Sequence, residues 1–142
     1  MYGLRMLGSW ILALFLAAMF LLIANEILFP DAPEENVVFP TLVAYSGMSL
    51  WEPTGRFIIG IAHPVAALLV FIPWTRRLGA ILAIVLSGGA LAAHALWLGT
   101  ELPVTLDSPA GETDNGILFY LAISLFVASI ALLFIHPRKH RH

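Results

Sequence analysis

The chain has 142 residues, of which 60% are hydrophobic and 11% charged, and its mean hydropathy is +0.91. This composition excludes an ordinary soluble domain, whose surface needs far more charge, and favours a membrane protein. The absence of cysteine excludes disulfides, thiolate metal sites and dithiol exchange. The formal net charge is −2 and no extended basic surface is evident, so nucleic acid is not an expected partner.

The first apolar run, residues 7–29, is long enough to cross the hydrocarbon core as a helix. Arg5 precedes it, as a basic residue precedes the apolar part of a signal peptide. The run is longer than that of a signal peptide, however, and no clear cleavage site precedes Asn25 and Glu26. We therefore expect this segment to stay in the protein as a membrane anchor.

Three further spans are predicted at residues 56–74, 78–98 and 116–135. The tripeptide Thr75-Arg76-Arg77 leaves almost no loop between the second and third spans, which predicts a tight antiparallel hairpin. The third span is rich in glycine and alanine, so we expect it to be the most buried. The predicted fold is all-α: one membrane domain, residues 1–142, forming an up-down bundle of four transmembrane helices.

A semi-apolar segment between the first two spans, residues 37–51, contains Pro40 and Gly47. It is too short and too interrupted to span a bilayer. Its aromatic residues Phe39, Tyr45 and Trp51 suit the headgroup region, which predicts an interfacial or re-entrant segment rather than a strand.

Charge is sorted by sign in this scheme. All Lys and Arg residues except Arg56 fall on one side: Arg5, Arg76, Arg77, Arg138, Lys139 and Arg141. All nine Asp and Glu residues fall at or beyond the other side. The positive-inside rule then places both termini in the cytoplasm and the chain in the cell (inner) membrane. Arg56, left among the acids, is expected to pair with one of them.

Polar residues that carry candidate chemistry gather in the outer half of the predicted bundle, whereas the inner half is expected to be almost purely apolar. Ionisable groups at membrane depth are costly and normally face the bundle interior or a cavity. The candidate ligand-binding residues are Glu26, Arg56, His63, His94 and Tyr120. The structural alternative is that Glu26 and Arg56 form an interfacial ion pair and that each histidine bonds a backbone carbonyl.

Three ligands are compatible with this set. Axial ligation of haem by His63 and His94 is chemically possible, and zinc would need further ligands such as Glu26 or Glu101. A quinone head group would use hydrogen-bond donors near the interface and an apolar slot for its tail. The basic ending of the chain, residues 136–142, is expected to contact anionic lipid heads, with metal capture by His136, His140 and His142 as the weaker choice.

The stretch from Gly55 to Ile135 resembles the DoxX-like family of small four-helix membrane proteins. The matching features are Arg56 at the start of the second span, the run Arg77-Leu78-Gly79-Ala80 that opens the third, and an A-x-x-H-like ending at Ala90 to His94. The resemblance implies a four-helix membrane fold and a quinone-linked redox role. Relatives linked to thiol chemistry carry cysteines, which this chain lacks.

Three functions therefore remain open, and the sequence does not decide whether the protein is an enzyme. The first is a redox-associated membrane subunit with a quinone or haem pocket in the outer half, working with a partner membrane or redox subunit. The second is a non-enzymatic lipid-binding, small-molecule-binding or chaperone-like assembly protein. The third is a small transporter, for which an oligomer of identical chains would have to supply the polar path that one chain lacks.

Overall fold

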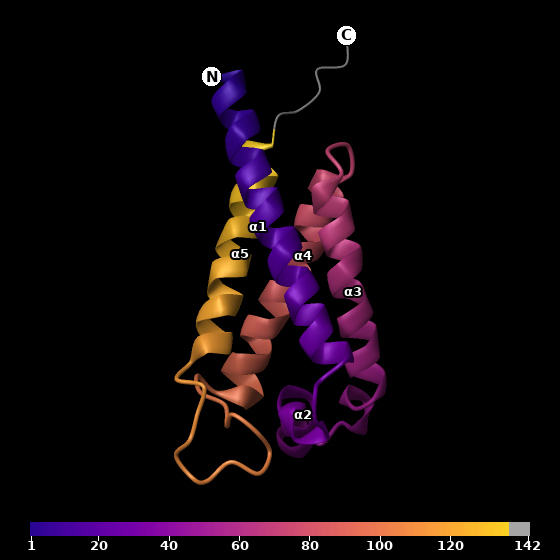
Figure 1. Cartoon of the computed structure of the whole chain (residues 1–142), viewed down its shortest axis with the longest axis vertical. Helices are drawn as coiled ribbons and strands as arrows, with labels where there is room; N and C mark the ends of the chain where they lie inside the picture. The colour runs from indigo at the N-terminus through magenta and orange to yellow at the C-terminus, as the bar shows by residue number, and fades with distance from the viewer. Residues whose placement is uncertain (137–142) are drawn as a thin grey trace.

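A computed structural model describes residues 1–136 of the chain, and these residues are helical, without strands (Figure 1). The long helices are α1 (Tyr2–Leu28), α3 (Thr54–Phe71), α4 (Arg76–Ala93) and α5 (Ile117–Ile135). Between α1 and α3 lie the short helix α2 (Val38–Ser46) and two 3-10 turns, η1 (Pro33–Glu35) and η2 (Ser49–Trp51). A π-helical turn, η3 (His94–Leu98), extends α4.

The four long helices pack side by side in a ring. Helix α1 contacts α3 and α5, and α4 contacts the same two helices. The start of α1, the α3–α4 turn and the end of α5 lie at one end of the bundle, which we name the basic end (Figure 1). Helix α2 and the segment 99–116 lie at the opposite end, which we name the acidic end (Figure 1).

All four long helices are long and apolar enough to span a membrane. Their bounds agree with the predicted spans to within a few residues. Helix α1 begins at Tyr2 rather than residue 7, and α4 ends at Ala93 rather than residue 98, where η3 ends. Residues 138, 139 and 141, which supported the predicted orientation, lie outside the described part, as do His140 and His142.

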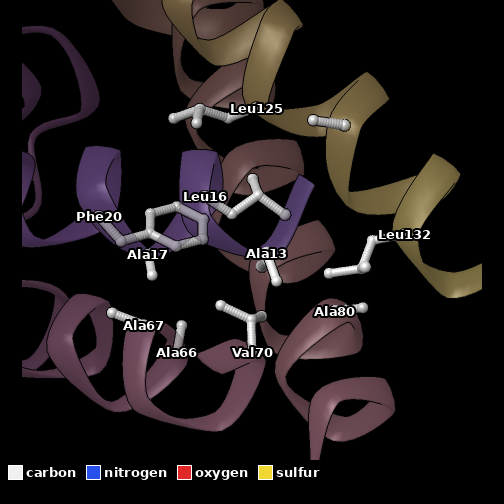
Figure 2. Close-up of a cluster of buried hydrophobic side chains, with 12 residues drawn as sticks. Ala13, Leu16, Ala17, Phe20, Ala66, Ala67, Val70, Ala80, Leu125 and Leu132 are labelled. Carbon is white, nitrogen blue, oxygen red and sulfur yellow. The ribbon is translucent and has the colours of Figure 1, made fainter. Parts of the chain in front are cut away.

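The core between the helices is built from small and medium apolar side chains. Figure 2 shows Leu16 and Phe20 of α1 lying between α3 and α5, with Ala80 contributed by α4. The opposing positions of α3 are small, which lets the helices approach closely. These positions are Ala66, Ala67 and Val70.

Two glycines mark the closest helix contacts. A Cβ placed on Gly79 of α4 would lie 2.7 Å from the Leu69 carbonyl carbon of α3. A Cβ on Gly60 of α3 would lie 2.6 Å from the Leu28 side chain of α1. Both distances are shorter than ordinary Cβ contacts. At Gly79 the neighbour is backbone, so only glycine fits there, whereas at Gly60 the Leu28 side chain would have to move.

The expectation that the third span is the most buried is wrong. In the most apolar 18-residue stretch of this span, 22% of the residues are buried, whereas the corresponding stretch of each of the other three helices has 28% of its residues buried. Gly79, Ala80 and Ala83 do face the core. Gly89 and Ala92, however, lie on the exposed face, so small residues in this helix do not all mark helix contacts.

At the acidic end, α2 closes the bundle. Phe39 and Leu42 of α2 are buried in a second apolar cluster with Leu98 and Leu102. With nine residues, α2 is about 14 Å long, too short to cross a bilayer. Gly47, with φ of 72°, ends the helix in the left-handed conformation that favours glycine.

Candidate functional site

His63 lies on α3 and is 8% exposed. Its Nδ1 atom is 2.7 Å from the carbonyl oxygen of Ile59, and its ring packs edge-on against Phe20 of α1 at 5.4 Å. Because a carbonyl only accepts, Nδ1 carries the hydrogen and Nε2 is the acceptor in the neutral ring. This is the backbone-bonded packing arrangement that was the structural alternative for the histidines.

His94 begins the π-helical turn and is 6% exposed. Its Nδ1 lies 2.6 Å from the carbonyl oxygen of Gly99, whose own N–H donates back to the His94 carbonyl. The ring packs edge-on against Phe119 of α5 at 5.5 Å. His94 thus fixes the end of α4 with a reciprocal pair of hydrogen bonds.

The two histidines lie at different depths. Val70 and Gly79 are in contact, so they mark one level of the α3–α4 pair. His63 is seven residues from Val70 and His94 is fifteen residues from Gly79, both toward the acidic end. The eight-residue difference corresponds to about 12 Å along the helices. They also face different partners, and no three metal-ligating side chains cluster within residues 1–136.

Arg56 has the acidic partner that the sequence predicted. Its Nε donates to Glu52 Oε1 at 2.9 Å, an i,i+4 ion pair, and its Nη1 donates to the carbonyl of Ile27 near the end of α1. Asn36 donates to the same carboxylate at 2.9 Å. Glu26, the partner expected in the structural alternative, is exposed, and no salt bridge joins it to Arg56 within residues 1–136. Arg56 therefore ties the start of α3 to the end of α1.

Tyr120 is 60% exposed on α5 and packs edge-on against Phe119 at 5.7 Å. The predicted residues therefore do not line one cavity: Tyr120 and Glu26 face outward, the two histidines pack at different levels, and Arg56 bonds to Glu52.

A shallow open cleft of about 360 Å³ is present at the acidic end, between η1, the start of α2 and the start of α5. Its lining combines apolar side chains, including Val38 and Leu118, with polar ones, including Glu35, Thr113 and Asn115. The N–H of Leu106 donates to the Glu34 carbonyl at 2.8 Å, which ties the segment 99–116 to η1. The sequence prediction missed this cleft, because its walls come from three segments far apart in the chain.

Asp114 fixes the geometry beside the cleft. Its Oδ1 accepts hydrogen bonds from the N–H groups of Leu102 and Gly116, and its Oδ2 accepts one from Leu118. Burial acts to raise the pKa of this carboxyl, but the three backbone hydrogen bonds and the nearby His94 outweigh it, so the pKa lies below its usual value. Asp114 is thus a carboxylate that caps α5 and holds the preceding segment in place.

The basic end holds a second polar group that the sequence prediction missed. Arg76, predicted in the short turn between the second and third spans, is the first residue of α4 and is fully buried. Ser9 and Ser129 are fully buried as well, so the expectation of an almost purely apolar inner half is wrong. Two features of the sequence could have indicated that Arg76 is buried: the polar Ser9 within the first span, and the lack of a loop around Arg76.

Comparison of the chain with known protein families, with characterised proteins and with solved structures finds no match. The candidate site therefore has to be assessed from its own geometry.

Proposed function

We propose that the protein is a multi-pass protein of the cell (inner) membrane, with four spans in up-down order, both termini in the cytoplasm and α2 at the outer interface. The support is the sorting of charge: the described basic residues other than Arg56 lie at the basic end, and the acids lie toward the other end. Membership of the DoxX-like family is part of this proposal and rests on the motifs around Arg56, Gly79 and His94.

Its proposed function is to bind a quinone, or another amphiphile with a neutral hydrogen-bonding head, at the outer end of the bundle as a redox-associated subunit. The observation that carries this proposal is the cleft beside α2 and α5. Its volume of about 360 Å³ lies within the range of small-molecule sites, roughly 300–1,000 Å³. A lining that combines apolar and polar side chains suits a head group with a lipid-like tail.

The charge around the cleft favours a neutral head. Glu35 and the ionised Asp114 line it, and no Lys or Arg is among its lining residues. These two carboxylates would repel a phosphate or carboxylate ligand. The Asn115 side-chain amide supplies both a donor and an acceptor for a carbonyl-bearing head.

Haem ligated by both histidines is less well supported, because one iron needs both imidazole nitrogens at bonding distance, about 2 Å each. The separation in depth of about 12 Å is incompatible with that geometry.

The test uses the full chain in neutral detergent with decylubiquinone as the probe. Wild type should unfold at a higher temperature when the quinone is added and should retain quinone through gel filtration. Leu118→Trp fills the cleft and should weaken binding about tenfold. Val127→Trp is the control, because Val127 lies on the same helix and is 58% exposed away from the cleft. Equal quinone binding by wild type and Leu118→Trp would refute the site.

The second candidate is a non-enzymatic lipid-binding or assembly protein that uses the same cleft. The exposed apolar residues of the long helices favour it, since they would suit a partner membrane protein or a second copy as well as lipid. It predicts that extracted wild type carries a lipid with an uncharged head, such as a diacylglycerol, that Leu118→Trp loses, without any stabilisation by quinone. Co-purification with a redox enzyme would instead favour the first candidate.

A further inference from the structure

The basic end contains a buried positive charge that has no counter-ion in the described structure. Arg76 has no exposed surface. All nine acidic residues lie within residues 26–52 and 101–114, so none belongs to the start of α1, the α3–α4 turn or the end of α5. Within residues 1–136 the only Arg or Lys salt bridge is that of Arg56, at the acidic end.

Neutral groups hold the Arg76 guanidinium in place. Its Nε donates to the Val70 carbonyl at 2.7 Å and its Nη2 to the Phe71 carbonyl at 3.1 Å, both at the end of α3. Its Nη1 donates to Ser9 Oγ at 3.1 Å, and the Trp10 ring centre lies 4.1 Å from its central carbon. These contacts satisfy hydrogen bonds, but they leave the full positive charge uncompensated.

Three further basic groups surround this charge. Arg5 donates to the Phe134 and Ile135 carbonyls at the end of α5, at 3.0 and 3.3 Å. His136 follows α5, and its Nδ1 is 2.9 Å from Ser9 Oγ. Arg77 is exposed, and together with Arg76 its charge acts on the His136 ring. The basic end is therefore a cluster of three guanidiniums and an imidazole, of which Arg5 and Arg76 are held by helix carbonyls.

The cluster lies at the level where lipid head groups are expected. Trp74, in the turn just before Arg76, is 81% exposed, and Tyr2 at the start of α1 is 67% exposed. Exposed Trp and Tyr at the ends of membrane helices typically lie at the headgroup level. Phosphate groups occur at this same level and bear the charge that the cluster lacks.

We propose that the basic end binds the phosphate of an anionic phospholipid, which contacts Arg77, Arg5 and the His136 ring. Arg76 does not touch the lipid; it supplies a fixed charge from behind, between the helices. The site is at the opposite end of the bundle from the cleft and does not depend on the function of the cleft. Arg5 and Arg76 are already held, so binding orders few additional side chains.

The test is a titration of the delipidated full chain, in neutral detergent, with short-chain phosphatidylglycerol, followed by native mass spectrometry. Phosphatidylcholine and inorganic phosphate are the comparison ligands. Phosphatidylglycerol should bind most tightly, and Arg77→Gln should weaken it about fivefold, the effect of one basic residue at a lipid surface. Arg77 is exposed, so this variant should fold normally.

Ala110→Glu is the matched control, since it changes the net charge by the same amount at an exposed position of the acidic end. It should change binding less than about twofold, because the proposed site depends on position rather than on total charge. Equal losses in the two variants, or equal affinity for phosphatidylglycerol and phosphatidylcholine, would overturn the proposal. Tight binding of inorganic phosphate alone would indicate a site for a free anion and would also overturn it.

Discussion

Arg76 of α4 donates a hydrogen bond to the hydroxyl of Ser9 in α1, 67 residues earlier in the chain. The same guanidinium donates to two carbonyls at the end of α3. Arg5 bonds the end of α5 in a similar way, and Arg56 bonds the end of α1. Carbonyls at a helix end lack intrahelical partners, and satisfying them is most important in an apolar environment. Three arginines thus each fasten the C-terminal end of a neighbouring helix.

We expect Arg76→Ala to lower the free energy of unfolding by about 2 kcal/mol or more, because it removes charge-assisted hydrogen bonds to Val70, Phe71 and Ser9. Arg77→Ala removes the same side chain from the next, exposed position and should cost less than about 0.5 kcal/mol. Unfolding of both variants in mixed micelles tests this. Similar losses in the two variants would contradict the structural role of Arg76.

Gly79→Ala should destabilise the bundle by about 1–3 kcal/mol, the usual range for overpacking. The added methyl group meets the backbone of α3 at Leu69 and Val70, which cannot move aside as a flexible side chain could. Gly89→Ala is the control on the same helix, because nothing lies within 4 Å of its added Cβ. It should be neutral or slightly stabilising, as alanine favours helix. Thermal unfolding in detergent compares the two.

The helices were predictable because a bilayer of fixed thickness demands long apolar runs, and such runs are visible in the sequence. An acidic partner for Arg56 was predictable, because Arg56 lies among acidic residues in the sequence. The identity of that partner was not, since Glu52 precedes α3 in an extended conformation rather than lying one turn earlier on the helix. The separation of acidic from basic residues along the chain was also visible in the sequence.

The burial of Arg76 was not predictable in the same way, since it depends on Ser9, Trp10 and the end of α3 arriving from elsewhere in the chain. The candidate site failed to converge for a related reason. A helical wheel gives the face on which His63 or His94 lies, but it does not give the neighbouring helix. The cleft is formed by three separate segments, and no local pattern marks it.

Asp114→Asn should loosen the acidic end. The asparagine has one acceptor oxygen in place of the two carboxylate oxygens that now accept from Leu102, Gly116 and Leu118. We expect a loss of about 1–2 kcal/mol and faster proteolysis within residues 99–116. Asp107→Asn is the control, because Asp107 is exposed in the same segment. Proteolysis that is equally fast in both variants would argue against a fastening role for Asp114.

His136 should make stability depend on pH at the basic end. Burial lowers the pKa of its ring, and the charges of Arg76 and Arg77 lower it further, against a smaller opposing effect of the Pro73 carbonyl. The unfolded chain therefore binds a proton more readily than the folded one. The contribution of His136 is fully present above its unfolded pKa of about 6.5 and is lost as the pH falls toward its lower folded value. The structural reason is that Nδ1 lies 2.9 Å from Ser9 Oγ, which also accepts from Arg76, so protonation of the ring places a second positive charge beside the buried guanidinium. The test is thermal unfolding of wild type and His136→Gln between pH 7.5 and about 5. As the pH falls, the unfolding midpoint temperature should decrease more steeply for wild type than for the variant. Parallel curves for the two proteins would show that His136 is not a source of this dependence.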